Sequence, residues 1–329
     1  MSVIICARNE AVNLQANLEK ILTQSYDNFE VIVVNDASTD ATQNVLQAFQ
    51  KQYPHLRIIN ISEKKILGKK GALAAGIEAA QNDWLLLTDA DCYPLSTNWI
   101  LGMMAGVISE KIQIILNYAP YEICDSSFLN KFIRFETVWT ATQYLSFALI
   151  GQPYMGVGRN LLYHKKLYNQ VGGFRSHVDI ASGDDDLFVN QVITNKNFSI
   201  ILTPETFMQS LPNRHWKGYF MQKKRHLSAS TRYLMRHKIL LGAISISHFG
   251  LFVTGVMLIY LKISTMFVVT SVVVRTVVVW YLYGKILIKL HEKHLFKYIP
   301  ILDFSYVFFY IIFTPFLILR TSHNWKRSP

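Results

Sequence analysis

Cysteine is scarce in this sequence. It occurs three times in 329 residues, as Cys6, Cys92 and Cys124, and never with C-x-x-C spacing. An odd count without paired spacing argues against a disulfide framework and against a zinc site, and it is typical of a reducing compartment. We therefore expect all three to be small, buried side chains without a disulfide.

Charged residues are also scarce, and acidic ones are fewer than basic ones. Charged side chains make up 17% of the sequence and hydrophobic ones 51%, whereas soluble domains carry about a quarter charged residues, so membrane segments are indicated. The net charge of +11 would suit nucleic acid, anionic lipid or a phosphate-bearing ligand. The basic residues crowd the middle and the C-terminal part. We therefore expect a lipid bilayer and a phosphate-bearing ligand as partners, and no nucleic acid.

Glycine is missing where a dinucleotide-binding enzyme would need it. The apolar start Val3–Cys6 is read as the first strand of a domain and not as a signal peptide; whether sequence precedes it is left open. Ala7, Arg8, Asn9 and Glu10 follow this strand. A Rossmann site requires G-x-G-x-x-G at this turn, so that the backbone can approach a pyrophosphate. The turn therefore argues against an enzyme that uses NAD or FAD.

Strand and helix patterns alternate over the first part of the chain. Short apolar runs at Val3–Cys6, Val31–Val34, Leu56–Ile61 and Trp84–Leu87 predict strands. Between these runs, apolar residues recur at helical spacing within 14–22, 45–49 and 73–80. This alternation predicts an α/β fold, with a mostly parallel sheet and helices on both faces.

Long apolar runs dominate the last third of the chain. Ile239–Leu261, Ile263–Gly284 and Ile301–Leu319 each approach the roughly 20 residues that cross a bilayer. Arg275 and Asp303 interrupt the second and third runs, and a charge in a span is costly unless it faces other helices or reaches the interface. We therefore expect a catalytic domain over 1–237 and a membrane domain over 238–329 with two to three transmembrane helices.

One earlier apolar segment is not expected to cross the membrane. Phe128–Leu149 reads as a long helix, but it carries Lys131, Arg134 and Glu136 in its first half. Those charges favour a helix that packs against protein or lies at the membrane interface.

The basic residues predict the orientation of the membrane segments. Seven of them precede the first span: Lys217, Lys223, Lys224, Arg225, Arg232, Arg236 and Lys238. The positive-inside rule places this flank, and with it the catalytic domain, in the cytosol. We therefore expect a multi-pass protein of the inner cell membrane. The loop after the second span is basic too, which fits a hairpin. The tail after the third run is also basic, so either this run is re-entrant or the rule fails there.

Three carboxylates are expected at one edge of the sheet. Asp36 ends the second strand, and Asp89 and Asp91 follow the fourth. Parallel α/β sheets bind ligands at the carboxyl ends of their strands. Oxygen ligands suit Mg²⁺ or Mn²⁺, which can bridge to phosphate. Taken singly, each acid could instead be a helix cap or a polar strand end.

Taken in order, these motifs make the sequence resemble the family 2 inverting glycosyltransferases, which have a GT-A fold, over roughly residues 2 to 230. The matching segments are Val3–Glu10, Val33–Asp40, the G-K-x-x-A-L segment at Gly68–Leu73, the D-x-D motif at Asp89–Asp91, the G-G-F motif at Gly172–Phe174 and the acidic run at Ser182–Leu187. The resemblance is to catalytic domains of the kind found in cellulose and hyaluronan synthases, and it is distant. It implies that Ala7, Arg8, Glu10, Asp36, Lys69 and Asp89 bind the donor, and that Asp91, with Asp89, holds the metal.

The same resemblance places the catalytic base in the acidic run. It favours Asp185, and a shift of one residue in the alignment would select Asp184. Three adjacent carboxylates repel one another, which would raise the pKa of the base. The alternative is that the run is only a solvated helix N-terminus, where acids are favoured by the helix dipole.

A last motif departs from the family pattern. Gln222–His226 resembles the Q-x-x-R-W motif, which implies that Gln222 and Arg225 contact the donor diphosphate. His226 stands where the family has a tryptophan on which an acceptor sugar stacks. This puts the acceptor site and processive synthesis in doubt.

The expected function is transfer of a hexose-type sugar from a nucleotide-diphosphate sugar, with UDP as the family's usual carrier, to a membrane lipid or glycan acceptor. A processive polysaccharide synthase and a catalytically silent nucleotide-sugar-binding module are the alternatives. A sugar-nucleotide pyrophosphorylase is disfavoured because it needs a glycine-rich loop after the first strand. The donor sugar, the acceptor, the linkage and the oligomeric state are left open.

Overall fold

The computed structural model describes residues 1–62, 68–124, 127–180 and 182–318. The strands are β1 (Ser2–Ala7), β2 (Glu30–Asp36), β3 (Leu56–Ile61), β4 (Trp84–Asp89), β5 (Cys92–Pro94), β6 (Ile114–Leu116), β7 (Leu161–His164), β8 (Phe198–Ile200) and β9 (Met208–Ser210). The α-helices are α1 (Ala11–Leu22), α2 (Thr42–Gln52), α3 (Lys69–Ala79), α4 (Trp99–Met104), α5 (Phe128–Leu149), α6 (Lys165–Gln170), α7 (Asp186–Val192), α8 (Trp216–Ser230), α9 (Met235–Tyr260), α10 (Thr265–Lys289) and α11 (Ile299–Ile318).

These elements form two compact units. The first comprises Met1–Ile123 and Gln143–Asn213, and the second comprises Cys124–Thr142 and the described residues from Arg214 onward. The predicted boundary at residue 237 stays a prediction.

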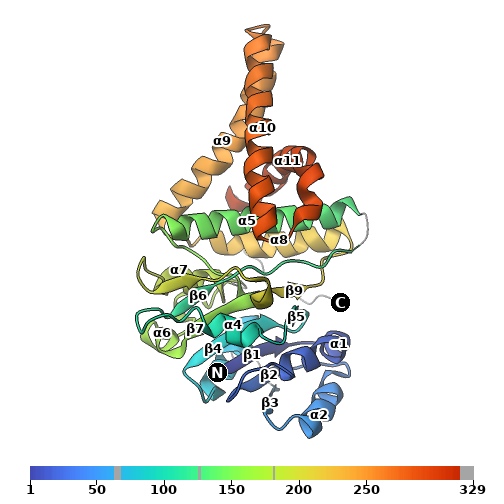
Figure 1. The fold of residues 1–329 in the computed structure, drawn as a ribbon, viewed down its shortest axis with the longest axis vertical. Helices are drawn as coiled ribbons and strands as arrows, with labels where there is room; N and C mark the ends of the chain where they lie inside the picture. Colours follow the sequence, from blue (N-terminus) through green and yellow to red (C-terminus); the bar gives the residue numbers. More distant parts are fainter. Residues whose placement is uncertain (63–67, 125–126, 181, 319–329) are drawn as a thin grey trace. The chain divides into compact units, whose positions relative to one another are not determined.

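The first unit is built on a seven-stranded sheet of order β3-β2-β1-β4-β7-β6-β8 (Figure 1). Strands β1 to β4 pair in parallel, while β7 runs antiparallel to both β4 and β6. All seven residues of β2 are buried, as expected for a central strand covered on both faces. The predicted mostly parallel sheet and its first four strands are confirmed.

Helices cover both faces of this sheet. Val3 and Ile5 of β1 point into a core shared with Leu14 and Leu18 of α1, whereas Ile4 points to the opposite face. There α3 packs so closely that a Cβ added at Gly76 would lie 2.7 Å from Ile4 Cγ2. A larger residue at position 76 would push the helix away from the sheet.

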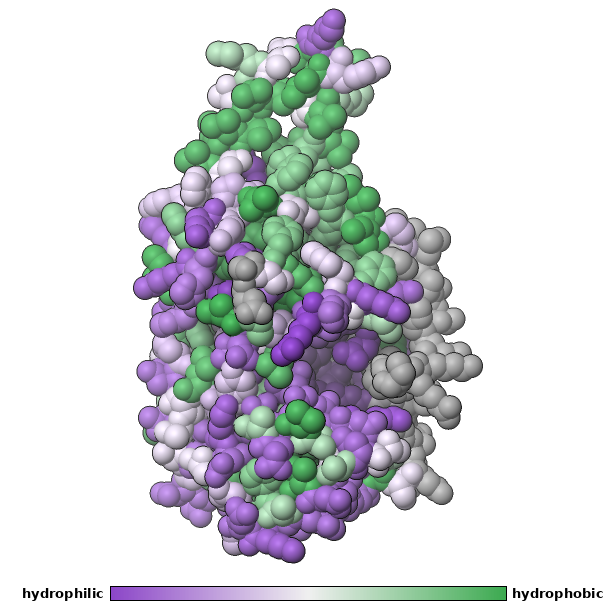
Figure 2. Space-filling model, turned by 90° about the vertical axis from the view of Figure 1, so that its right-hand side faces the viewer, coloured by the Kyte–Doolittle hydropathy of each residue, from purple (hydrophilic) through white to green (hydrophobic). Residues whose placement is uncertain are grey.

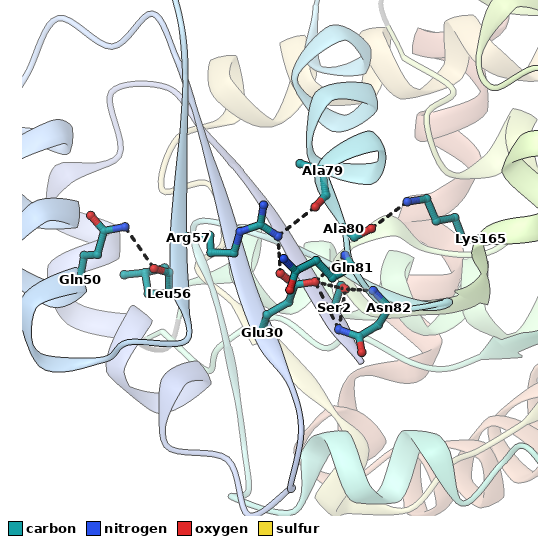
Figure 3. A network of polar contacts seen from close by, with 10 residues as sticks. All are labelled: Ser2, Glu30, Gln50, Leu56, Arg57, Ala79, Ala80, Gln81, Asn82 and Lys165. Atoms are coloured by element: carbon teal, nitrogen blue, oxygen red, sulfur yellow. Dashed lines mark hydrogen bonds and ion pairs between the residues drawn. The ribbon is translucent and has the colours of Figure 1, made fainter.

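A polar network closes the end of the sheet where the parallel strands begin (Figure 3). Glu30 accepts hydrogen bonds from the Ser2 hydroxyl at 2.6 Å, from the backbone N–H of Gln81 at 2.7 Å and from Arg57 at 2.6 Å. Burial alone would raise the pKa of Glu30, but the hydrogen bonds from Ser2, Arg57 and Gln81 outweigh it and lower this pKa. The network therefore holds a buried carboxylate in its charged form.

The second unit contains three helical segments that are long and apolar enough to cross a membrane: Met235–Tyr260, Thr265–Lys289 and Lys293–Pro315. Figure 2 shows hydrophobic residues covering the surface of this part of the chain. Phe128–Leu149, which we expected not to cross, is one continuous helix and is not among the three.

Ion pairs lie inside the second unit. Arg134 of α5 pairs with Glu292, Lys223 of α8 pairs with Glu136 of α5, and Arg275 of α10 pairs with Asp303 of α11. The side chains of all three acids are at most 5% exposed. The two charges that interrupt the apolar runs are thus each other's partner, which is how their cost inside a span is reduced.

Candidate functional site

The candidate site lies where the parallel strands end. Strand β4 ends at Asp89, and the chain then passes through Asp91 and Cys92 into β5. One ligand atom each of Asp89, Asp91 and Cys92 lies within 4.8 Å of the others. The expectation that the acids at 89 and 91 turn toward one place is confirmed.

The carboxylate of Asp91 is in an environment that disfavours its charge. Burial raises the pKa of Asp91, and the neighbouring charge of Asp89 raises it further. The Cys92 thiol donates a hydrogen bond to Asp91 Oδ1 at 3.3 Å. Burial, followed by the charges of Asp91 and Asp89, raises the pKa of Cys92 well above its ordinary value, so the thiol stays neutral. Two crowded carboxylates with hard oxygen atoms fit Mg²⁺ or Mn²⁺, whose charge would relieve their repulsion.

Lys69 connects this pair of acids to the acidic run. Its Nζ pairs with Asp89 and lies 3.4 Å from Asp184 Oδ2. Burial alone would lower the pKa of Lys69, but Asp89 and Asp184 outweigh it and raise this pKa well above its ordinary value. Lys69 is therefore charged, and it joins three segments that are far apart in the sequence.

Asp185 is the N-cap residue of helix α7. Its carboxylate accepts hydrogen bonds from the backbone N–H of Asp186 at 2.8 Å and of Gly158 at 2.6 Å. Burial raises the pKa of Asp185 to about 6, and the charge of Asp184 adds to the effect. The expected direction of this shift is correct, although burial and not repulsion is its larger cause. The helix N-terminus that was the alternative interpretation of the acidic run is also present. Asp185 therefore caps a helix and has a raised pKa at the same time.

Two loops beside these acids are tied together. Asn9, at φ 58, follows β1 and accepts a hydrogen bond from Thr39 N at 2.8 Å. The N–H of Glu10 donates to the Thr42 hydroxyl at 2.9 Å. Burial raises the pKa of Glu10, and Asp91 and Asp89 are among the charges that act on it. The first two motifs therefore form one wall next to the acids.

The remaining predicted donor residues occupy different positions. Ala7 and Asp36 are buried at the ends of β1 and β2, and Arg8 is exposed in the loop that follows β1. Gln222 and Arg225 lie on α8, in the second unit. Contact of any of these residues with a donor stays a prediction.

Sequence reasoning missed Lys70, the immediate neighbour of Lys69. Lys70 is fully buried, and its Nζ donates to the carbonyl oxygens of His177, Ile180 and Ser182 at 2.6, 2.7 and 2.7 Å. These carbonyls precede the acidic run, so Lys70 holds the segment that delivers Asp184 and Asp185. A second lysine in the G-K-x-x-A-L segment was the available signal.

Arg159 was missed as well, and no pattern in the sequence points to it. Its guanidinium donates to Ala119 O at 2.8 Å and to the Ser210 hydroxyl, and it lies 4.1 Å from the centroid of the Tyr121 ring. Its positive charge acts on Asp91. Arg159 therefore favours the charged form of Asp91, and the two residues come close only in the folded chain.

The cysteines follow the expectation in part. All three are free. Only Cys92 is buried, whereas Cys6 and Cys124 are half-buried. The expectation that all three would be buried is wrong, because Cys6 lies near the carboxyl end of β1, and Cys124 lies in a loop.

Comparison with known proteins gives a consistent picture. Residues 2–172 match the family model described as glycosyl transferase family 2. A probable glycosyltransferase of Bacillus subtilis, YdaM, is 27% identical over 240 residues, which cover 68% of this chain and 54% of that protein. An Escherichia coli protein, UDP-Glc:alpha-D-GlcNAc-diphosphoundecaprenol beta-1,3-glucosyltransferase WfaP, is 28% identical over 125 residues, or 37% of this chain and 46% of that protein. The chain spans about half the length of these relatives.

A solved structure shares the fold. It is the mannosyltransferase PcManGT from Pyrobaculum calidifontis in complex with GDP-Man and Mn²⁺. The TM-score is 0.56 at 19% identity, over 70% of this chain and 61% of that one. The expected α/β fold of GT-A type is thereby confirmed.

Proposed function

Because the chain belongs to glycosyl transferase family 2, we propose that it transfers a sugar from a nucleotide-diphosphate sugar to a membrane-associated acceptor. The observation that carries the proposal is the meeting of three family motifs at one point, where Lys69 pairs with Asp89 and approaches Asp184. A UDP-sugar is the proposed donor, and a lipid carrier or glycolipid is the proposed acceptor. The name of the Escherichia coli relative describes such a reaction, from UDP-Glc to a diphosphoundecaprenol-linked sugar.

Residue roles follow from the site's chemistry. Asp91 and Asp89 would hold Mg²⁺ or Mn²⁺, which, when bound, neutralises charge on the donor diphosphate. Lys69 supplies a second positive charge beside them. As the acceptor oxygen bonds to the anomeric carbon and the bond to the diphosphate breaks, Asp185 takes the acceptor's proton. A pKa of about 6 leaves Asp185 mostly deprotonated at neutral pH, as a base requires.

The membrane placement is part of the same proposal. The flank before α9 carries basic residues and no acidic ones from Arg214 to Lys238, which favours a cytosolic catalytic domain by the positive-inside rule. In this proposal the catalytic domain ends near residue 237. An acceptor held in the bilayer suits a chain whose second unit carries three membrane-length helices.

The test is nucleotide release by the full chain in detergent, over a panel of UDP- and GDP-sugars with Mg²⁺ or Mn²⁺. We expect one donor to be hydrolysed or transferred only with metal present. Asp91→Asn and Asp185→Asn should each lower the rate on the order of 100-fold, whereas Asp27→Asn, at an exposed position, should not change it. Activity that survives in both site variants would refute the roles, and the absence of both turnover and nucleotide-sugar binding with every donor would refute the transferase proposal.

A further inference from the structure

The second unit contains a groove that the proposed reaction does not use. It has a volume of about 470 Å³. Its lining residues come from α5, α9 and α10: Trp139, Ala243, Ile244, Ser247, His248, Leu251 and Arg275. Helices α9 and α10 separate from each other away from their connecting turn (Figure 1). The groove therefore lies within helices of membrane-spanning length.

One face of α9 supplies most of the wall. Ile244, Ser247, His248 and Leu251 follow helical i, i+3, i+4, i+7 spacing, so they lie on one side of the helix. Two of them are apolar and two are polar. The polar pair occupies the middle of a helix that runs from Met235 to Tyr260, where polar side chains are rare unless they serve a function.

His248 has capacity to bind a ligand. It is 5% exposed, and neither of its ring nitrogens makes a hydrogen bond within the part of the chain that the structure describes. Its Nε2 lies 3.6 Å from Asp303 Oδ1, beyond hydrogen-bond distance. The ring is held in place by Trp139, whose centroid is 5.2 Å away, and by Tyr306, which stacks at 6.3 Å. A buried imidazole whose two nitrogens make no hydrogen bond can still bond to a ligand.

Arg275 supplies the charge. Both terminal nitrogens of its guanidinium donate hydrogen bonds to the Asp303 carboxylate, and Nη2 lies 3.0 Å from Oδ1. The carboxylate is covered, with 4% of its side chain exposed, whereas 21% of the Arg275 side chain is exposed. A guanidinium carries five N–H donors, so Arg275 keeps donors for a further partner. Arg275, His248 and Ser247 line the groove, whereas Asp303 is not among its lining residues.

We propose that this groove binds the phosphate of a lipid, with the hydrocarbon chain lying along Ile244, Leu251 and Trp139. Arginine is the side chain best suited to phosphate oxygens, which it contacts bidentately. Apolar walls beside a donor-rich end match a molecule with a phosphate on a long hydrocarbon chain. Such a phosphate occurs on polyisoprenyl carriers and on phosphatidic acid. If the bound lipid is a polyisoprenyl carrier, its role as acceptor rests on the proposed sugar transfer, whereas binding itself is tested without any donor.

The experiment uses the full chain in nanodiscs of phosphatidylcholine and native mass spectrometry to count retained lipid. Four probes are compared: a polyisoprenyl monophosphate, phosphatidic acid, the polyisoprenol without phosphate, and inorganic phosphate. We expect one phosphate lipid to be retained, and the polyisoprenol and inorganic phosphate to bind roughly tenfold more weakly or worse. Preference for the first or second probe identifies the source of the phosphate. Equal binding of both would support a site for any lipid phosphate.

The variants separate binding from folding. Arg275→Gln combined with Asp303→Asn removes both charges, so that neither is left buried without its partner. Ile244→Trp fills the groove and leaves the charges in place. Both should lower retention of the phosphate lipid roughly tenfold, while Lys262→Gln, which removes an exposed cation outside the groove, should not.

Two results would overturn the proposal. The first is wild-type retention by both groove variants when gel filtration and thermal melting show that they are folded. The second is equal retention of the polyisoprenol with and without its phosphate. Loss of nucleotide release in the same preparations would bear on the transferase proposal alone.

Discussion

The two ends of the parallel strands hold carboxylates whose pKa values are shifted in opposite directions. Where the strands begin, Glu30 receives hydrogen bonds from Ser2, Gln81 and Arg57, and its pKa is lowered in spite of burial. Where the strands end, burial and neighbouring acids raise the pKa of Asp91, and that of Asp185 to about 6. Glu30 belongs to strand β2, whereas Asp91 follows β4 and Asp185 precedes α7.

The difference separates stability from chemistry. A carboxylate whose pKa is lowered on folding stabilises the folded state at neutral pH, and one whose pKa is raised destabilises it. At the first end the hydrogen bonds to Glu30 outweigh the effect of burial. At the second end burial outweighs the hydrogen bonds that Asp185 accepts from Gly158 and Asp186. The second end holds excess negative charge, which suits a cation and a proton to be accepted from outside. Four experiments test this contrast.

The largest effect is expected from Asp91→Asn. Removing one of two crowded carboxylates should lower the transfer rate on the order of 100-fold, because the proposed metal would lose a ligand. The same change should leave the melting temperature unchanged or raise it, since the lost charge is unfavourable in the folded state. Nucleotide release and thermal melting without added metal test both parts. A marked fall in melting temperature would contradict the contrast.

Lys70→Met is expected to come next. Three carbonyl oxygens would lose their donor, which should cost about 2–4 kcal/mol of unfolding free energy. The segment before Asp184 would also lose its anchor, so turnover should fall more than donor affinity. Denaturant unfolding and the separate measurement of kcat and KM test this, with the exposed Lys51→Met as the control. An unchanged kcat with reduced stability would limit Lys70 to a structural role.

Glu30→Gln addresses the opposite end of the sheet. The amide keeps the shape of the side chain but loses the charge that Arg57 and Ser2 stabilise. We expect a loss of about 2 kcal/mol in unfolding free energy and no change in turnover per folded molecule. Denaturant unfolding and transfer assays on the same preparation decide the matter. A fall in turnover at unchanged stability would show that the two ends are not independent.

The smallest effect is the response to pH. With a pKa of about 6, Asp185 as base predicts a roughly tenfold fall in transfer rate between pH 7 and pH 5. Stability should not fall with it, because protonating a group whose folded pKa is raised favours the folded state. The contribution of Glu30, whose pKa is lowered, is lost only as the pH falls below about 4. A rate profile that is flat between pH 5 and 7 would exclude Asp185 as the base.

Much of the fold can be predicted from the sequence because its signals are local. The β-branched run at Val31–Val34 and the apolar stripes between the strands fix the element types, and parallel strands place their carboxyl ends at one edge. For this reason the positions of Asp89 and Asp91 along the chain suffice to predict that the two acids lie together. The long helix at Phe128–Leu149 can be predicted on the same basis.

The sequence alone was thus enough to predict the first four strands, the long helices, the family and the acids that end the parallel strands, since periodicity and motif order are properties of neighbouring residues. Only the tertiary structure decided which distant groups meet. Lys70 reaches carbonyls more than 100 residues away, and the charges of Arg275 and Asp303, which look costly singly, form one pair. The physical reason is that an ion pair or a buried hydrogen bond is set by the path of the whole chain, and residue type and spacing do not encode that path locally.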